Sequence, residues 1–265
     1  MDVTEIERTL NAYIRPQTFP VAIRMVQDKS EIPPKAQSWR KRGIRITNCQ
    51  ALGLARRQGL TIALTREDDS CPLGRIVLGF EPPASFYAEG NCCSGMYTET
   101  REAGNRSETA IEKFPYGEYQ AMLAAPLNRA NFDPDVIAVY GTPAQVMRLV
   151  HGALYKNGGS LTGSTECRLD CSEVIVRTIR RDSCQYVLPC LGDRVYALVE
   201  EHEMIFTMPR SKVDEVLAGV KATHDAGLRY PLQPFSFFEV EFPLKYQKLI
   251  EIQEEEKRNN ATIVG

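Results

Sequence analysis

The feature that most constrains the fold is a unit, found twice, in which a β-strand precedes a capped helix. In the first unit Val21–Val26 predicts a strand, and Thr47 or Asn48 caps the helix that follows. In the second, Val136–Tyr140 predicts a strand, and Thr142 caps a helix that begins with proline. We therefore expect an α/β or α+β fold with a mixed sheet, in which two similar lobes from an internal duplication flank an irregular middle insert.

The chain divides into four predicted parts. The first lobe covers residues 1–80, an irregular loop and helix insert covers 81–134, the second lobe covers 135–250, and a polar tail covers 251–265. Helices are expected at residues 4–14, 47–58, 105–113, 117–124 and 142–156, and from Pro72 and Ser211. Strands are expected at residues 20–26, 60–65, 135–140, 185–188, 194–199 and 204–208. The tail has few apolar residues, which predicts a frayed helix or a disordered segment.

Composition excludes several classes of protein. The 265 residues are 43% hydrophobic and carry a formal net charge of −2, which excludes disorder throughout and gives no electrostatic case for binding nucleic acid or anionic membranes. No apolar run is long enough to span a bilayer. The acidic start lacks the basic and apolar regions of a signal peptide, so we expect a cytoplasmic location.

The chain contains eight cysteines and three histidines. In a reduced compartment, clustered cysteines bind metal or perform redox chemistry more often than they form disulfides, although a single cysteine is often a small buried apolar group. The sequence contains no Cys-x-x-Cys, His-Glu-x-x-His, Gly-x-Gly-x-x-Gly or Gly-x-Ser-x-Gly motif and no P-loop lysine. These absences argue against zinc ribbons, dithiol oxidoreductases, nucleotide folds and serine hydrolases.

The cysteines are spread along the chain and belong to none of these motifs. Cys49 falls in the first turn of a helix, Cys71 precedes a proline at a helix start, and Cys167 and Cys190 fall at the ends of strands or loops. Free backbone N–H groups at helix starts favour thiolates. Four thiolates that converge from loops match the ligand set of a cubane iron–sulfur cluster or of a structural zinc ion.

Several segments together resemble one family of cysteine-rich archaeal and bacterial proteins, catalogued as domain of unknown function 169. The most specific is the stretch Pro143–Val150, which reads Pro-Ala-Gln-Val-Met-Arg-Leu-Val. The others are Pro20–Ile23, Cys49–Ala51, Ser70–Pro72, Ala125–Leu127, Phe132–Val136 and Leu188–Arg194, together with Gly163 and Cys167. The resemblance implies a fold relationship and a cysteine pattern without naming a reaction.

The family's characteristic cysteines match Cys49, Cys71, Cys167 and Cys190, two in each proposed half. The resemblance thus implies a four-thiolate site between the halves, and we favour a 4Fe–4S cluster over zinc. The expected function is that of a cytosolic iron–sulfur protein with redox or cluster-dependent small-molecule chemistry. Its partner is expected to be a small-molecule substrate or an electron-transfer protein, and an enzyme of this kind would be an oxidoreductase or a lyase. The alternative is a non-catalytic module that binds a small molecule or a protein, with a structural zinc or a reduced cysteine cluster.

The chain departs from the family pattern in carrying Cys92, Cys93, Cys171 and Cys184 as well. These cysteines are either incidental core residues or, for the adjacent pair Cys92 and Cys93, an extra ligand or a reactive pair that is a candidate for catalysis. The basic runs Arg40–Arg42, Arg56–Arg57 and Arg180–Arg181 either bind an anionic substrate or form solvated faces.

Overall fold

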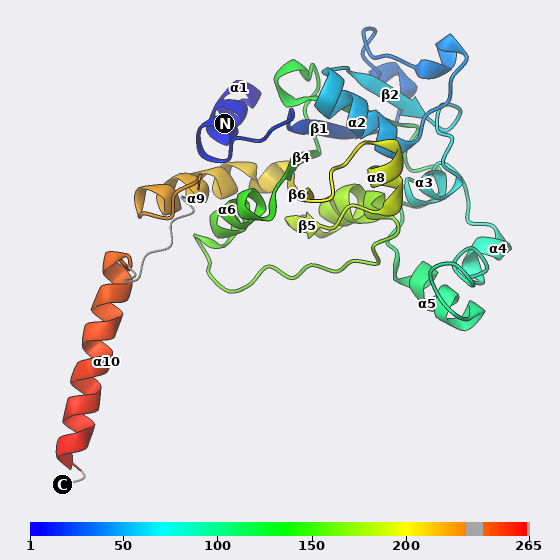
Figure 1. Ribbon diagram of the computed structural model, residues 1–265. Coiled ribbons are helices and arrows are strands. Elements are labelled where there is room, and N and C mark those ends of the chain that lie inside the picture. The colour runs from blue at the N-terminus through cyan, green and yellow to red at the C-terminus, as the bar shows by residue number, and fades with distance from the viewer. Residues whose placement is uncertain (232–240, 264–265) are drawn as a thin grey trace.

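The computed structural model describes residues 1–231 and 241–263, and its centre is a six-stranded sheet (Figure 1). The strands are β1 (Val21–Val26), β2 (Ile62–Thr65), β3 (Ala121–Pro126), β4 (Val136–Gly141), β5 (Gln185–Val187) and β6 (Met204–Pro209). Their order is β2-β3-β1-β4-β6-β5, and every pairing between these strands is antiparallel. The fold is therefore α+β, with an antiparallel sheet in place of the expected mixed one.

Helices cover both faces of the sheet. One face carries α2 (Asn48–Gln58), α3 (Pro72–Val77), the π-helix η4 (Ser172–Arg177), α7 (Thr178–Arg181) and α8 (Leu191–Tyr196). The other carries α1 (Val3–Tyr13), α6 (Pro143–Leu154) and α9 (Val213–Asp225). Because successive strand side chains point to opposite faces, Val21 and Ile23 of β1 join the first core, while Ala22 joins the second.

The remaining helices lie away from the sheet. A peripheral hairpin contains α4 (Ser85–Ala88) and α5 (Arg101–Ala110), and short 3-10 turns occupy Lys29–Glu31, Trp39–Arg42, Leu127–Arg129 and Arg210–Lys212. The C-terminal α10 (Leu244–Ile263) extends away from the body, and its described side chains are exposed. The predicted polar tail is thus helical as far as Ile263, and residues 264–265 lie outside the described ranges. No helix within those ranges has the length and apolar character needed to cross a membrane.

Capping explains where the two expected helices begin. At the start of α2, the Thr47 hydroxyl accepts a hydrogen bond from Gln50 N at 3.1 Å, and the Gln50 side chain accepts one from Thr47 N at 2.9 Å. The same reciprocal pair forms between Thr142 and Gln145 at the start of α6. Gly59, with φ of 71°, ends α2 in the left-handed region. The predicted starts of both helices are therefore confirmed.

Two predicted elements are wrong. Residues 117–124 were expected to be helical, yet Ala121–Pro126 form β3, which pairs with β1 and β2 and is buried along its whole length. Residues 194–199 were expected to form a strand, yet Leu191–Tyr196 form α8 and Leu198 then turns with φ of 55°. In both cases tertiary context overrides local propensity, because β3 fills the gap between two strands and α8 contacts α2. The predicted middle insert therefore supplies a strand to the sheet.

The strand order reads the same from either edge of the sheet: β1 corresponds to β4, β3 to β6 and β2 to β5. This symmetry does not extend to the helices that suggested the duplication, because α2 and α6 pack on opposite faces. The helix that shares the face of α2 and precedes β5 is instead η4 with α7. The structure thus does not confirm the internal duplication.

Candidate metal centre

Four cysteines line one pocket of about 220 Å³ on the sheet face that carries α2 and α8. They are Cys49, Cys71, Cys171 and Cys190. Cys49, Cys171 and Cys190 are buried, and Cys71 is half-buried. The structure therefore brings together three of the four cysteines in the predicted ligand set and adds Cys171, which the sequence analysis left unassigned.

Each of these cysteines stands at the start of a helix. Cys49 is the second residue of α2, Cys171 immediately precedes η4, and Cys71 and Cys190 are the N-cap residues of α3 and α8. At α3 the Cys71 sulfur acts as the capping group and accepts a hydrogen bond from Gly74 N at 3.2 Å. Helix starts present backbone N–H groups and positive partial charge, which favour sulfur in its anionic form.

The four cysteines occupy equivalent positions in the two halves of the sheet, which are related by the symmetric strand order. Cys71 follows β2 and Cys190 follows β5, the two edge strands, while Cys49 and Cys171 start the helices that lead into those strands. Two sulfurs thus come from each half of the sheet, as the resemblance implied, with Cys171 in the place expected of Cys167.

The closest donor set in the pocket contains two sulfurs and one carboxylate. Sγ of Cys49, Sγ of Cys190 and a carboxylate oxygen of Asp170 all lie within 4.8 Å of one another. Asp170 Oδ2 also accepts a hydrogen bond from Cys190 N at 3.1 Å, which fixes the carboxylate beside that cysteine. A mixed thiolate and carboxylate set of this kind can bind a cation.

The surroundings of the sulfurs favour neutral thiols over thiolates. A hydrogen bond with Cys190, together with burial, raises the pKa of Cys49 well above its ordinary value, and Asp193 and Asp170 add to the shift. Burial also raises the pKa of Cys71, and it raises the pKa of Cys171 well above the ordinary range. A bound cation would oppose these shifts and favour the deprotonated forms of the sulfurs.

Buried polar groups lie close to the pocket. Asp193 is 1% exposed, and its pKa is raised well above the ordinary value by burial and by the neighbouring Asp170. Arg56, also 1% exposed, lies over the Tyr140 ring at 4.2 Å from the centroid and bonds to Glu203. Arg56 is therefore not part of a solvated face, because it is a buried structural residue, whereas its neighbour Arg57 is exposed. A single sequence shows no sign of this burial.

Cys167 is not among the cysteines that line the pocket. Its side chain is exposed, its φ is 52°, and its backbone N–H donates to Thr165 Oγ1 at 3.0 Å. Cys184 is buried in the core on the opposite face of the sheet, among residues of α6 and α9. That position fits the interpretation of Cys184 as an incidental core residue.

Cys92 and Cys93 lie in the peripheral hairpin. Cys93 is fully buried and donates a hydrogen bond from Sγ to Glu108 Oε1 at 3.3 Å, and the same oxygen pairs with Arg168 Nη1 at 2.6 Å. Burial and the Glu108 hydrogen bond raise the pKa of Cys93 to about 11. A nucleophilic cysteine needs a lowered pKa, so this environment favours a structural thiol. The catalytic assignment of the pair stays a prediction.

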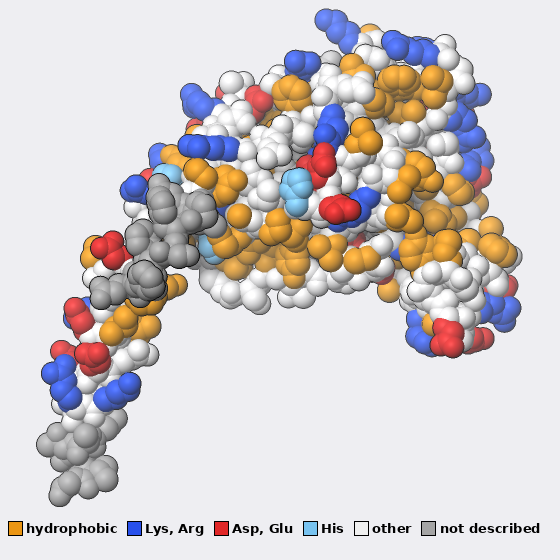
Figure 2. All heavy atoms as spheres, in the orientation of Figure 1, with side chains coloured by type: hydrophobic (Ala, Val, Ile, Leu, Met, Phe, Trp, Pro, Cys, Tyr) orange, Lys and Arg blue, Asp and Glu red, His pale blue; other side chains and the backbone are white. Residues whose placement is uncertain are grey.

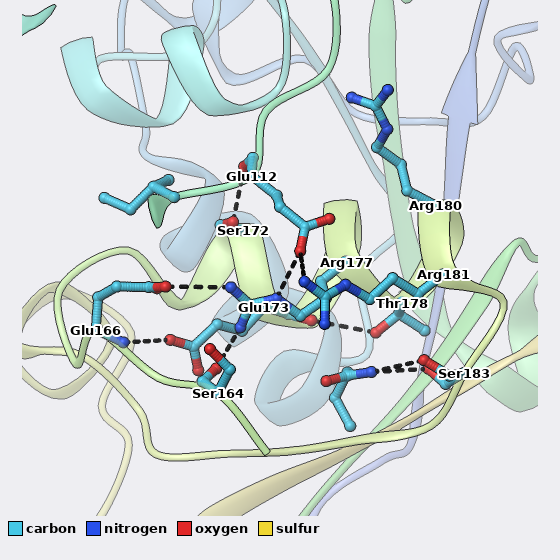
Figure 3. A network of polar contacts seen from close by, with 12 residues as sticks. Glu112, Ser164, Glu166, Ser172, Glu173, Arg177, Thr178, Arg180, Arg181 and Ser183 are labelled. Atoms are coloured by element: carbon cyan, nitrogen blue, oxygen red, sulfur yellow. Dashed lines mark hydrogen bonds and ion pairs between the residues drawn. The ribbon is translucent and has the colours of Figure 1, made fainter. Parts of the chain in front are cut away.

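A network of buried polar groups holds the segment that carries Cys171 (Figure 3). Arg177, on η4, pairs with Glu112 at 3.0 Å and with Glu166 at 3.1 Å. Glu173 accepts a hydrogen bond from Glu166 N at 3.0 Å, and Ser172 donates to the Glu112 carbonyl oxygen at 2.7 Å. These contacts hold the segment on both sides of Asp170 and Cys171, two of the residues that line the pocket.

The mouth of the pocket is apolar. Leu73, Tyr97 and Val195 contribute to its lining, and Met96 and Leu191 do so while 71% and 60% exposed. Hydrophobic side chains accordingly gather on the surface over α8 and toward α4 (Figure 2). An apolar entrance above a set of polar donors is the usual form of a small-molecule site.

Comparison with known proteins identifies relatives of the chain without assigning a reaction. An uncharacterized protein of Methanocaldococcus jannaschii is 25% identical over 228 residues, which cover 83% of this chain and 96% of that protein. No solved structure gives a significant match. The model of the DUF169 family, described as "Uncharacterised ArCR", matches residues 9–219. The chain belongs to the DUF169 family.

Proposed function

We propose that the chain is an iron–sulfur protein whose cluster is bound by Cys49, Cys71, Cys171 and Cys190. The observation that carries the proposal is that four thiols from four separate helix starts line a single pocket. Cysteines buried only for packing have no reason to line the same pocket, whereas a 4Fe–4S cluster needs four thiolates around it.

The backbone around the sulfurs supports this assignment. The N–H groups of Cys49, Cys71 and Cys190 are held by side-chain oxygens of Asn48, Asp69 and Asp170, at 2.8, 2.8 and 3.1 Å. Each of these bonds fixes the orientation of a cysteine before any ligand is bound. Such outer contacts orient ligands and tune the centre in known metal sites.

The apolar entrance indicates what the centre does. Exposed Met96 and Leu191 leave the pocket open on one side, so a small apolar molecule or a partner protein can approach the sulfurs. We infer a redox function or cluster-dependent chemistry on a small molecule, and an enzyme with this site would be an oxidoreductase or a lyase.

A structural zinc site is the second candidate, and one observation favours it. Sulfurs bound to a single tetrahedral zinc lie about 3.8 Å apart, as follows from a Zn–S bond of about 2.3 Å. The Cys49, Cys190 and Asp170 donors lie within 4.8 Å of one another, which is close to this spacing. A module that binds zinc in this way would use the ion to join α2 and α8.

Metal analysis of anaerobically purified protein distinguishes the two candidates. An iron–sulfur protein will be brown and will contain iron and acid-labile sulfide in equal amounts, about four of each per chain. A zinc protein will be colourless with one zinc per chain. Protein that contains neither metal, and that takes up neither on reconstitution, will contradict both candidates.

A further inference from the structure

A second pocket, of about 280 Å³, lies beside the metal-site pocket and shares Tyr196 with it. It is bounded by residues 39–46, by α2 and by the end of α8. Gly53 allows this close approach, because a Cβ atom there would lie 3.0 Å from the Ala197 carbonyl oxygen. The pocket thus lies where α2 and the end of α8 pack closely together.

The lining of this second pocket is mainly apolar. Trp39, Ile44, Leu54 and Leu198 are among its lining residues. Ile44 and Leu198 are 49% and 66% exposed, an unfavourable arrangement for large apolar side chains in water. A ligand with an apolar body would cover this surface.

Three cations directly follow Trp39, one of the residues that line this pocket. Arg40, Lys41 and Arg42 are exposed, and none of the three has a carboxylate within 4.0 Å in the described part of the chain. The Arg42 guanidinium lies 5.2 Å from the centroid of the Trp39 ring, so its charge is close to one of the lining residues. Arg57 also lines the pocket, where it pairs with Glu200 at 3.1 Å. Arg57 also lies 3.7 Å from Glu203, so its charge is compensated, and the net positive charge near Trp39 comes from Arg40, Lys41 and Arg42.

We propose that this pocket binds a small anionic molecule that carries an apolar or aromatic body. The body would lie against Trp39, Leu54 and Leu198, and a phosphate or carboxylate group would meet the charges of Arg40–Arg42. A concave apolar lining with a few charged groups at one edge is typical of small-ligand sites. The proposal goes beyond the metal centre and does not depend on it.

The chain reports on this site directly, because Trp39 is its only tryptophan. We expect phenyl phosphate to change the Trp39 fluorescence in a saturable manner, and equilibrium dialysis to give the same affinity. Phenol and inorganic phosphate, which each supply half of the recognition, should bind at least about tenfold more weakly. Added salt should weaken the binding of phenyl phosphate, since the cations are exposed.

Leu198→Asp tests the position of the ligand. Leu198 has φ of 55°, a conformation that Asp adopts more readily than Leu, so the backbone should tolerate the change. The added negative charge should weaken phenyl phosphate binding by about tenfold or more. The matched control is Leu228→Asp, at a residue that is 40% exposed and outside the pocket lining, and it should bind like the wild type.

Arg42→Gln tests whether the positive charge beside Trp39 contributes to binding. Its control is Arg8→Gln, at another exposed arginine. Only Arg42→Gln should weaken the binding of phenyl phosphate. A lack of saturable binding of phenyl phosphate overturns the proposal, and so does equal affinity in the Leu198→Asp and Leu228→Asp variants. If phenol and phenyl phosphate bind equally well, the anionic group contributes nothing to binding, and the proposal is overturned as well. The metal content of the same samples is a separate readout, so failure here is distinct from failure of the metal centre.

Discussion

The guanidinium of Arg56 donates two hydrogen bonds to the carboxylate of Glu203, at 2.7 and 2.9 Å, although 147 residues separate them in the chain. Arg56 lies on α2, and Glu203 immediately precedes β6. Their side chains are 0% and 6% exposed. The pair therefore links the first half of the sheet to the second, close to the candidate metal centre.

Glu203→Gln should lower the free energy of unfolding by about 3 kcal/mol, because it leaves the Arg56 charge buried without a counter-ion. Denaturant unfolding of the variant and the wild type measures the difference. The control is Glu31→Gln, which removes one partner of the exposed pair with Arg24 and should cost at most about 1 kcal/mol. Equal losses of unfolding free energy in the two variants would show that the buried pair stabilises the fold no more than the exposed pair does.

The same pair predicts a dependence of stability on pH. Burial alone would raise the pKa of Glu203, but the Arg56 hydrogen bond, a backbone hydrogen bond and the nearby arginines together hold that pKa below its ordinary value. A lowered pKa contributes stability above the pKa of the unfolded chain, and that contribution is lost as pH falls through the folded pKa. The wild type should thus lose its advantage over Glu203→Gln between about pH 5 and pH 3. A gap that stays constant over this range would contradict the explanation.

Single Cys→Ser variants test which thiols bind metal. Cys49→Ser, Cys71→Ser, Cys171→Ser and Cys190→Ser should each reduce the metal content of anaerobically purified protein, because each removes a sulfur from the pocket. Cys184→Ser, on the opposite face of the sheet, is the matched control for a buried cysteine and should keep the metal. Cys167→Ser decides between the set that the resemblance implied and the set that lines the pocket. If it loses metal while Cys171→Ser keeps it, the resemblance identified the right ligand.

Gly152→Ala should destabilise the second core. The helices α6 and α9 approach closely at Gly152, where an added Cβ would collide with the Val216 carbonyl oxygen and the Val220 side chain. Overpacking of this kind costs about 1–3 kcal/mol, which thermal or denaturant unfolding can measure. Ala218→Ser adds one atom to an exposed position of α9 and should leave the stability nearly unchanged.

Truncation after Gln253 should leave the stability of the body nearly unchanged. The described side chains of α10 are exposed, so residues 254–259 bury little apolar surface. Loss of folding or a large drop in the unfolding midpoint would show instead that the helix docks on the body.

Strand β4 was predictable because Val136–Tyr140 is a continuous apolar run between Asp135 and Gly141, and β1 was predictable because Arg24 is the one charged residue in Val21–Val26. Strand β3 was not, because its sequence Ala-Met-Leu-Ala-Ala-Pro favours a helix when isolated. Its strand conformation depends on pairing with β1 and β2, which are distant in sequence. The end of α8 was predicted as a strand although it is helical, because Val195 and Tyr196 are residues typical of strands.

At the candidate site, Cys49, Cys71 and Cys190 could be named in advance because they match the characteristic cysteines of the family, and Cys49 and Cys71 also fall at predicted helix starts. Cys171 could not, because Cys167 lies only four residues earlier and matched the family pattern. What separates them is the backbone at Cys167, whose φ of 52° turns the chain so that its side chain stays exposed. A positive φ at a residue other than glycine is uncommon and leaves no mark in a single sequence. The apolar segment Val174–Val176, which anchors η4 in the core, was the available signal for Cys171.

The strands β1 and β4 meet through three residue pairs, whereas β1 and β3 share six. The two halves of the sheet therefore join along a short seam. The four sulfurs come from both sides of that seam. Any ion or cluster bound by all four would act as a clasp across it, so release of the metal and separation of the two halves would form one cooperative step.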